Sequence, residues 1–159
     1  MAKRWAKRSE PMSLLPGNRR ALVAGFVLVD LIGLGVGGTI WALQGRLPEP
    51  MATHFSGGSP DGFGSVSSVA LAAAVVTMGV GGIVAGLAVV QPGPRAGRRA
   101  LYGLGIGLAV FVAVLFLLMT LAQLDLANAQ MARLSWEAAL ASAVLGASVG
   151  LATSPLIRE

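Results

Sequence analysis

The chain has 159 residues, of which 55% are hydrophobic and only 12% are charged, whereas a water-soluble domain carries roughly 25% charged residues. Too few charges are present to cover the surface of a globular domain, so the composition favours an integral membrane protein. The sequence contains no cysteine, which excludes disulfide bonds and thiolate metal sites. The net charge of +5 does not indicate nucleic-acid binding, because the basic residues gather in short segments beside apolar runs.

The first element in chain order is a basic tail, residues 1–20. It holds half of all the Lys and Arg residues: Lys3, Arg4, Lys7, Arg8, Arg19 and Arg20. The apolar run that follows the tail is longer than the 7–15 residues of a cleaved signal peptide, and no A-x-A site comes after it. We therefore expect a tail that stays attached to an uncleaved signal-anchor helix.

Four long apolar runs follow, and only one charged residue, Asp30, interrupts any of them. Each run has at least 20 residues, and a helix needs about 20 residues to cross the hydrocarbon core. The runs do not alternate between apolar and polar residues, which argues against membrane strands. The sequence predicts an all-α integral membrane protein, with a membrane domain over residues 21–157 and transmembrane helices at 21–43, 66–90, 101–124 and 138–157.

The basic residues also predict the orientation. The tail is rich in Lys and Arg, the loops after the first and third runs carry one Arg each, and the loop after the second run carries three. Since Lys and Arg favour the cytoplasmic side, both termini are expected in the cytoplasm and the 44–65 loop outside. The preference for Arg over Lys, together with abundant Ala, Gly and Val, suggests a GC-rich bacterial genome, so the expected location is the bacterial cell membrane. The loop residues are Arg46, Arg95, Arg98, Arg99 and Arg133.

Each predicted helix contains two glycines four positions apart, which places both on one helix face. Small residues let membrane helices approach closely, so these pairs predict a compact bundle. They do not distinguish an internal contact from a homo-oligomer. The pairs are Gly33 with Gly37, Gly82 with Gly86, Gly103 with Gly107, and Gly146 with Gly150.

Asp30 lies in the middle of the first predicted helix. An ionised carboxylate there costs on the order of 3 kcal/mol on insertion scales, and such residues usually face the bundle interior and mark an ion or proton path. The alternative is a structural Asp that is protonated or hydrogen-bonded, with Thr77, Thr120 or Ser148 as its partner. The sequence leaves both interpretations open.

The 44–65 loop is rich in residues that fix the backbone. Pro48 and Pro50 favour an extended chain, and residues 51–56 are expected to form one short strand. Residues 59–62 read Ser-Pro-Asp-Gly, which matches a type I turn. We therefore expect an ordered extracytoplasmic loop rather than a flexible linker.

His54 is the only histidine and is expected to meet Asp61 across that turn. The pair suits a metal, a pH response or a hydrogen bond to a ligand, or it simply fixes the loop. A metal site normally has three or four protein ligands, and the other acids on that side are only Glu49, Asp125 and Glu137. We predict no metal, no other cofactor and no catalytic residues, because no Ser–His–Asp order, carboxylate pair or zinc helix is evident. The predicted binding residues of the loop are Pro48, His54, Phe55, Pro60, Asp61 and Gly62.

Residues 47–65 read LPEPMATHFSGGSPDGFGS, with a Leu-Pro pair, then a His, then a Gly-x-x-Asp-Gly turn, directly after a first membrane helix. This segment resembles the signature of DUF1648, a bacterial membrane-domain family of unknown function, and the resemblance covers about residues 20–70. In that family the domain also forms the N-terminal part of an immunity and signalling protein that protects cells from a secreted cannibalism toxin. The chain departs from the family in having Ser65-Val66-Ser67-Ser68 where Lys is frequent after the turn, and it lacks the further spans of the longer immunity proteins.

Two functions remain as predictions from the sequence. The first is a small receptor-like, immunity-like or regulatory protein that binds an extracellular peptide or a membrane partner through residues 47–64. The second is a small proton-coupled transporter that uses Asp30, by similarity to four-span exporters with one carboxylate in the first helix. The expected partners are the lipid bilayer and that peptide or protein, with a homo-oligomer left open and nucleic acid excluded.

Overall fold

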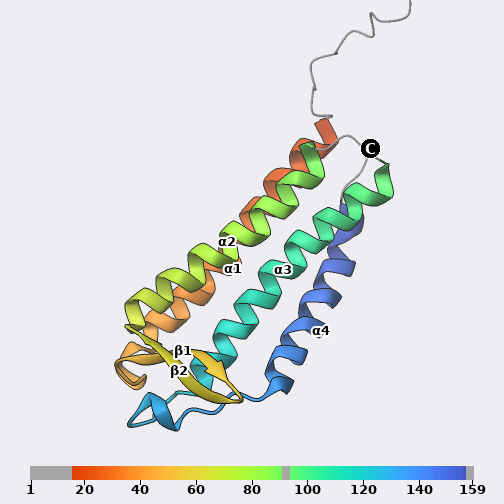
Figure 1. Ribbon diagram of the computed structural model, residues 1–159. Helices are drawn as coiled ribbons and strands as arrows, with labels where there is room; N and C mark the ends of the chain where they lie inside the picture. Colours follow the sequence, from red (N-terminus) through yellow and green to blue (C-terminus); the bar gives the residue numbers. More distant parts are fainter. Residues whose placement is uncertain (1–15, 91–93, 157–159) are drawn as a thin grey trace, which may run out of the picture.

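The computed structural model describes residues 16–90 and 94–156 (Figure 1). Four helices account for most of this part of the chain: α1 (Pro16–Ala42), α2 (Val66–Val90), α3 (Arg95–Leu121) and α4 (Trp136–Thr153). Each is long and apolar enough to cross a membrane; the fourth span, Trp136–Leu156, consists of α4 and the 3-10 helix η3 (Ser154–Leu156) that follows it. The prediction of four membrane helices is therefore confirmed.

The helix boundaries differ from those predicted at the basic segments. Helix α1 begins at Pro16, a residue that suits the first helical position, so residues 16–20 of the predicted tail are helical. Residues 1–15 of that tail lie outside the described part of the chain. Helix α3 begins at Arg95 and includes Arg98 and Arg99, which were predicted to lie in a loop. Long apolar runs mark the hydrophobic part of a helix, and the helices continue beyond it into polar sequence.

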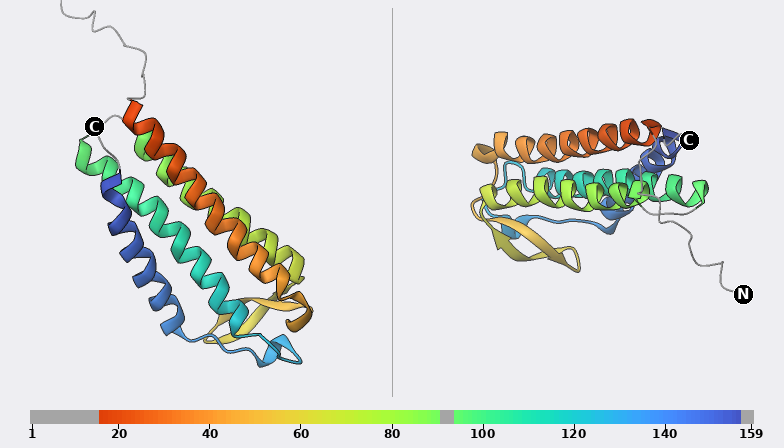
Figure 2. Two further views of the ribbon diagram at one scale, coloured as in Figure 1. Left: turned by 180° about the vertical axis from the view of Figure 1, so that it is seen from behind. Right: turned by 90° about the horizontal axis from the view of Figure 1, so that it is seen from above.

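The helices do not form a closed four-helix bundle, as Figures 1 and 2 show. Helices α1, α2 and α3 pack against one another, whereas α4 packs mainly on α3. The buried side chains of one cluster, which include Val29, Tyr102 and Ile106, come from the first three helices. The expectation of a compact bundle is correct for these three helices and wrong for α4.

The glycine pairs lie at contacts between helices of the same chain. A Cβ atom on Gly146 would lie 2.6 Å from the carbonyl oxygen of Gly107, and one on Gly150 would lie 2.6 Å from that of Gly103. At Gly37 a Cβ atom would lie 2.8 Å from the carbonyl oxygen of Ala70 in α2. Only glycine permits such close approach of two backbones, so these glycines set the α1–α2 and α3–α4 contacts.

A β-hairpin stands between α1 and α2. Strands β1 (Met51–Ser56) and β2 (Ser59–Gly64) are antiparallel, and Met51 pairs with Gly64. The turn consists of Gly57 and Gly58, with φ angles of +56° and +82°. Positive φ at both central residues is what a two-residue hairpin turn with the favoured strand twist requires. The predicted strand at 51–56 is confirmed.

The predicted type I turn at residues 59–62 is wrong, because these residues form part of β2. The all-α prediction also needs this correction, since the fold includes a small two-stranded sheet. The 44–65 loop does adopt an ordered structure. Its base contributes to the protein core, where Leu47 and Met51 join a buried cluster with residues of α1, α2 and α3.

The hairpin, the short 3-10 helix η1 (Gln44–Arg46) and the α3–α4 connection with its 3-10 helix η2 (Ala129–Met131) gather at one end of the helices (Figure 1). We call this the hairpin end. The end of α2, the start of α3 and the described chain ends lie at the opposite end. Residues far apart in the sequence therefore meet at the hairpin end, where the predicted binding loop lies.

Candidate recognition surface at the hairpin end

Gln123, just after α3, fixes the hairpin to the helices. Its side chain is fully buried. Its Oε1 accepts a hydrogen bond from the Ala52 N–H at 2.5 Å, and its Nε2 donates to the Ala52 carbonyl at 3.0 Å. The same Nε2 donates to the Met119 carbonyl in the last turn of α3. One amide group thus joins β1 to α3 and satisfies buried backbone groups of both.

A second connection joins the segment after α1 to the segment after α3. The Arg46 guanidinium donates to both carboxylate oxygens of Asp125, at 2.9 and 2.5 Å, and the Asp125 N–H donates to the Arg46 carbonyl at 2.8 Å. The hydrogen bond from Arg46 lowers the pKa of Asp125, and the same bond raises the pKa of Arg46. A bidentate pair of this kind adds geometric definition, even on an exposed surface.

Two weaker contacts complete the attachment. The Leu134 N–H donates to the Gly58 carbonyl at 3.3 Å, which links the hairpin turn to the residues before α4. Glu49 accepts a hydrogen bond from the Val66 N–H at 3.0 Å, at the start of α2. Because helix N-termini carry unpaired N–H groups, this carboxylate stabilises α2. Glu49 and Asp125, considered above as metal ligands, therefore both have structural partners.

His54 and Asp61 meet across the paired strands. The His54 Nδ1–H donates to the Asp61 carboxylate at 2.5 Å. The side chains remain 72% and 47% exposed, so the pair is available to a ligand. His54 lies opposite Gly62, where a Cβ atom would come within 3.0 Å of the His54 Cβ. The predicted contact is present, although it runs across a strand pair and not across a turn. Within the described residues, no three His, Asp or Glu side chains form a metal-binding cluster.

The other predicted loop residues have different environments. Pro48 is buried at the base of the hairpin, and Phe55 is half-buried opposite Pro60. Gly62 makes room for His54, as described above. These residues therefore shape the hairpin, while His54 and Asp61 form its exposed polar surface.

A cleft of about 380 Å³ separates the hairpin from the α3–α4 connection. One wall consists of Pro48, Pro50 and Phe63, which are apolar, together with Glu49. Residues 127–130, with the amides of Asn128 and Gln130, form the other wall. Phe63 is 43% exposed and so presents much of its ring. The sequence did not predict that Phe63 and residues 127–130 belong to the surface, because only the fold brings them together.

Asp30 has no hydrogen bond or ion pair with any residue in the described part of the chain. Its proposed hydroxyl partners are wrong. The hydroxyls of Thr120 and Ser148 donate at 2.8 Å to carbonyls four residues earlier in their own helices. The Thr77 hydroxyl is buried and has no hydrogen-bond partner among the described residues. Asp30 is only partly buried and shares a helix face with the exposed Leu34, four residues later. It therefore lies toward the outer surface of the helices.

No family model matches the chain, and no match was found among the curated proteins or the solved structures. The resemblance of residues 47–65 to DUF1648 therefore stays a prediction. The chemistry of the hairpin end must be interpreted from its own geometry, which combines a fixed hairpin, an exposed His–Asp pair and a cleft with one mainly apolar and one amide-bearing wall.

Proposed function

We propose that this chain is a receptor-like or immunity-like protein of the bacterial cell membrane, and that its hairpin end binds an extracellular peptide segment. The peptide is either free or an exposed part of another membrane protein. In this proposal both termini lie in the cytoplasm, as the Lys and Arg distribution of the sequence indicates. The observation that carries the proposal is the attachment of the hairpin to the helices through Gln123.

This attachment matters because a two-stranded hairpin alone is at best marginally stable in water. The buried Gln123 amide and the Arg46–Asp125 pair hold the hairpin in one position relative to the helices. A surface that is ordered before binding loses less conformational entropy when a ligand arrives. The arrangement therefore suits recognition better than it suits a linker between two membrane helices.

The cleft beside the hairpin suits a peptide. Pro50 and Phe63, both exposed, provide contact for apolar side chains, and the amides of Asn128 and Gln130 can bond a peptide backbone. In the two connections at this end and the first turn of α4, acids outnumber bases: Glu49, Asp61, Asp125 and Glu137 against Arg46 and Arg133. This balance favours a peptide with basic residues, which would approach Asp61 beside His54.

Photocrosslinking in intact cells tests the proposal. Phe63 is replaced by a photoreactive phenylalanine. The cells are then exposed to the peptide fraction secreted into the medium by a culture of the same bacterium. We expect a peptide adduct, identified by mass spectrometry, that is lost in His54→Ala and Asp61→Ala variants. The matched control places the photoreactive residue at Leu151, which is exposed on α4 toward the opposite end. Equal adducts at both positions, or adducts unaffected by the two variants at normal protein levels, would exclude peptide recognition by the hairpin.

A further inference from the structure

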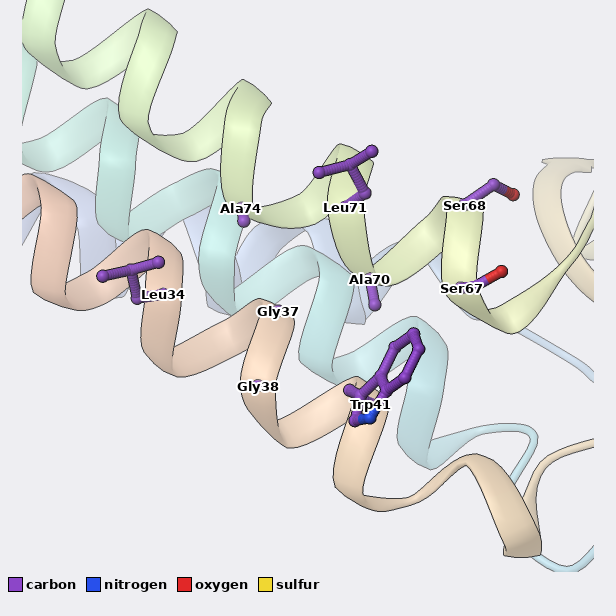
Figure 3. A pocket seen from close by; sticks show the side chains of 9 residues that line it. All are labelled: Leu34, Gly37, Gly38, Trp41, Ser67, Ser68, Ala70, Leu71 and Ala74. Atoms are coloured by element: carbon purple, nitrogen blue, oxygen red, sulfur yellow. The ribbon is translucent and has the colours of Figure 1, made fainter.

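A groove runs along the outside of the α1–α2 contact, beginning near the hairpin end (Figure 3). Its volume is about 600 Å³. The floor consists of small residues, among them Gly37, Gly38 and Ala74, and Leu34, Leu71 and Trp41 stand at its sides. Trp41 is 53% exposed, so nothing within the described chain covers this aromatic wall. The groove lies within the apolar part of both helices, where lipid or another helix is the only available neighbour.

Asp30 belongs to the same face of α1 as the groove. Residues at i, i+4, i+7 and i+11 lie on one side of a helix, and these positions are Asp30, Leu34, Gly37 and Trp41. Asp30 is therefore one helical turn beyond Leu34, past the end of the groove that is farther from the hairpin, and it is not one of the residues that line the groove. It is the unpaired acid described above, within the span formed by residues 23–42.

Charge decides what occupies the groove. Acidic side chains within membranes generally pair with basic ones. The apolar runs predicted from the sequence contain no Lys or Arg, and Arg46 is already paired with Asp125. A second copy of the chain would therefore bring another acid to Asp30 and no base. A lipid chain would fill the apolar groove and leave the carboxylate unpaired.

We infer that the groove binds a transmembrane helix of a different protein, which carries a Lys or Arg at the depth of Asp30. The small residues of the floor let that helix approach the α1 and α2 backbones closely. Ser67 and Ser68 line the end of the groove nearer the hairpin, where both hydroxyls already bond Ser65, so Asp30 is the polar group that identifies the partner. This inference does not depend on peptide binding by the hairpin.

Cysteine crosslinking tests it, and the natural absence of cysteine leaves no background thiol. The full-length Leu34→Cys chain is co-expressed in membranes with a designed single-span Leu/Ala helix that has a central Lys. The designed helix carries one Cys four residues before or after the Lys, so that both orientations are sampled. A second probe has Leu in place of the Lys. The matched control is the Val144→Cys chain, whose cysteine lies on the exposed face of α4.

We expect about tenfold more crosslinking to the Lys probe than to the Leu probe, as one interhelical polar interaction in a membrane allows. Asp30→Asn should reduce crosslinking to the Lys probe to the level seen with the Leu probe, and Asp30→Glu should restore the higher level. Equal crosslinking of both probes, or no effect of Asp30→Asn, would overturn the inference. Leu34→Cys dimers above the Val144→Cys level would instead assign the groove to a second copy. Crosslinking no higher than the Val144→Cys level would assign it to lipid.

Discussion

Gln123 forms with its side-chain amide both hydrogen bonds that a neighbouring strand would make with Ala52. The two residues are 71 positions apart, one just after the third membrane helix and the other in the first strand of the hairpin. Because Gln123 also bonds the last turn of α3, the position of the hairpin depends on the position of that helix. The proposed recognition surface is thus part of the membrane fold and not an independent loop.

Replacing Gln123 by Leu should detach the hairpin. The change leaves the Ala52 N–H and carbonyl without their partner in a buried site, at a cost of about 2 kcal/mol. We expect a lower unfolding temperature in detergent and faster proteolysis within the hairpin. Gln44→Leu is the matched control, because that amide is exposed at the same end. Equal behaviour of the two variants would mean that the Gln123 amide does not hold the hairpin.

The Arg46–Asp125 pair should make the hairpin end sensitive to acid. The fold lowers the pKa of Asp125 below its ordinary value of 3.8, so the folded state binds this proton less readily than the unfolded state. The stabilisation is therefore complete above that value and is lost as the pH falls through the folded pKa. Proteolysis of the hairpin, followed from pH 7 to about pH 3 with an acid-tolerant protease, should accelerate at the acidic end.

Asp125→Asn is the control for this acid response. Asn accepts the φ angle of +59° at this position and keeps the backbone bond to Arg46, but it cannot titrate. We expect the variant to be less protected at neutral pH and to lose the part of the acid response due to this pair. Parallel pH profiles of the two proteins would show that another group controls the response.

The hairpin turn should depend on glycine at position 57 and not on proline at position 60. Gly57→Val places a β-branched residue at a positive φ angle, which costs roughly 1–2 kcal/mol. Gly57→Asn should be tolerated, since Asn accepts this conformation in hairpin turns. Pro60→Ala should change the unfolding temperature little, because Pro60 lies in β2. A larger loss for Pro60→Ala than for Gly57→Val would instead place the turn at residues 59–62.

The membrane helices were predictable because their length and lack of charge are properties of the sequence alone. The position of the hairpin turn was not predictable in this way, because Gly57-Gly58 and Ser59–Gly62 are both good local turn sequences. The choice between them depends on which residues pair across the strands. Gln123 was overlooked within an apolar run, since its role depends on Ala52 being brought next to it by the fold. The same limit applies to Phe63 and the α3–α4 connection, which form one cleft only after folding.

The prediction of hydroxyl partners for Asp30 was wrong because these hydroxyls bond within their own helices. A hydroxyl on a helix can donate to the carbonyl four residues earlier, as Thr120 and Ser148 do, and then needs no distant carboxylate. The glycine pairs, for their part, predict close approach without naming the partner helix. They correctly indicate that α4 contacts a neighbouring helix. That helix is mainly α3.

The position of Asp30 also leads to a prediction about transport. Carboxylates of proton paths face the bundle interior or a water-filled cavity, whereas Asp30 shares its face with exposed Leu34. We expect vesicles that contain the chain to show no proton-driven efflux of a cationic dye beyond that of Asp30→Asn vesicles. The measurement is dye fluorescence after an imposed pH gradient. Efflux that disappears in Asp30→Asn would establish the transporter that the sequence left open.

Helix α4 should separate from the rest of the fold when its glycine contact is filled. A side chain at position 146 would meet the Gly107 carbonyl, which lies 2.6 Å from the expected Cβ position, so Gly146→Leu must push α4 away from α3. Overpacking of this kind costs about 1–3 kcal/mol. Because α4 packs mainly on α3, its loss should leave α1, α2 and the hairpin assembled. We therefore expect faster hydrogen exchange in α4 and an unchanged rate at β1.

Ala147→Leu, on the exposed face of α4, is the matched control and should change neither rate. Simultaneous loss of protection in α4 and β1 would show that α4 supports the whole fold.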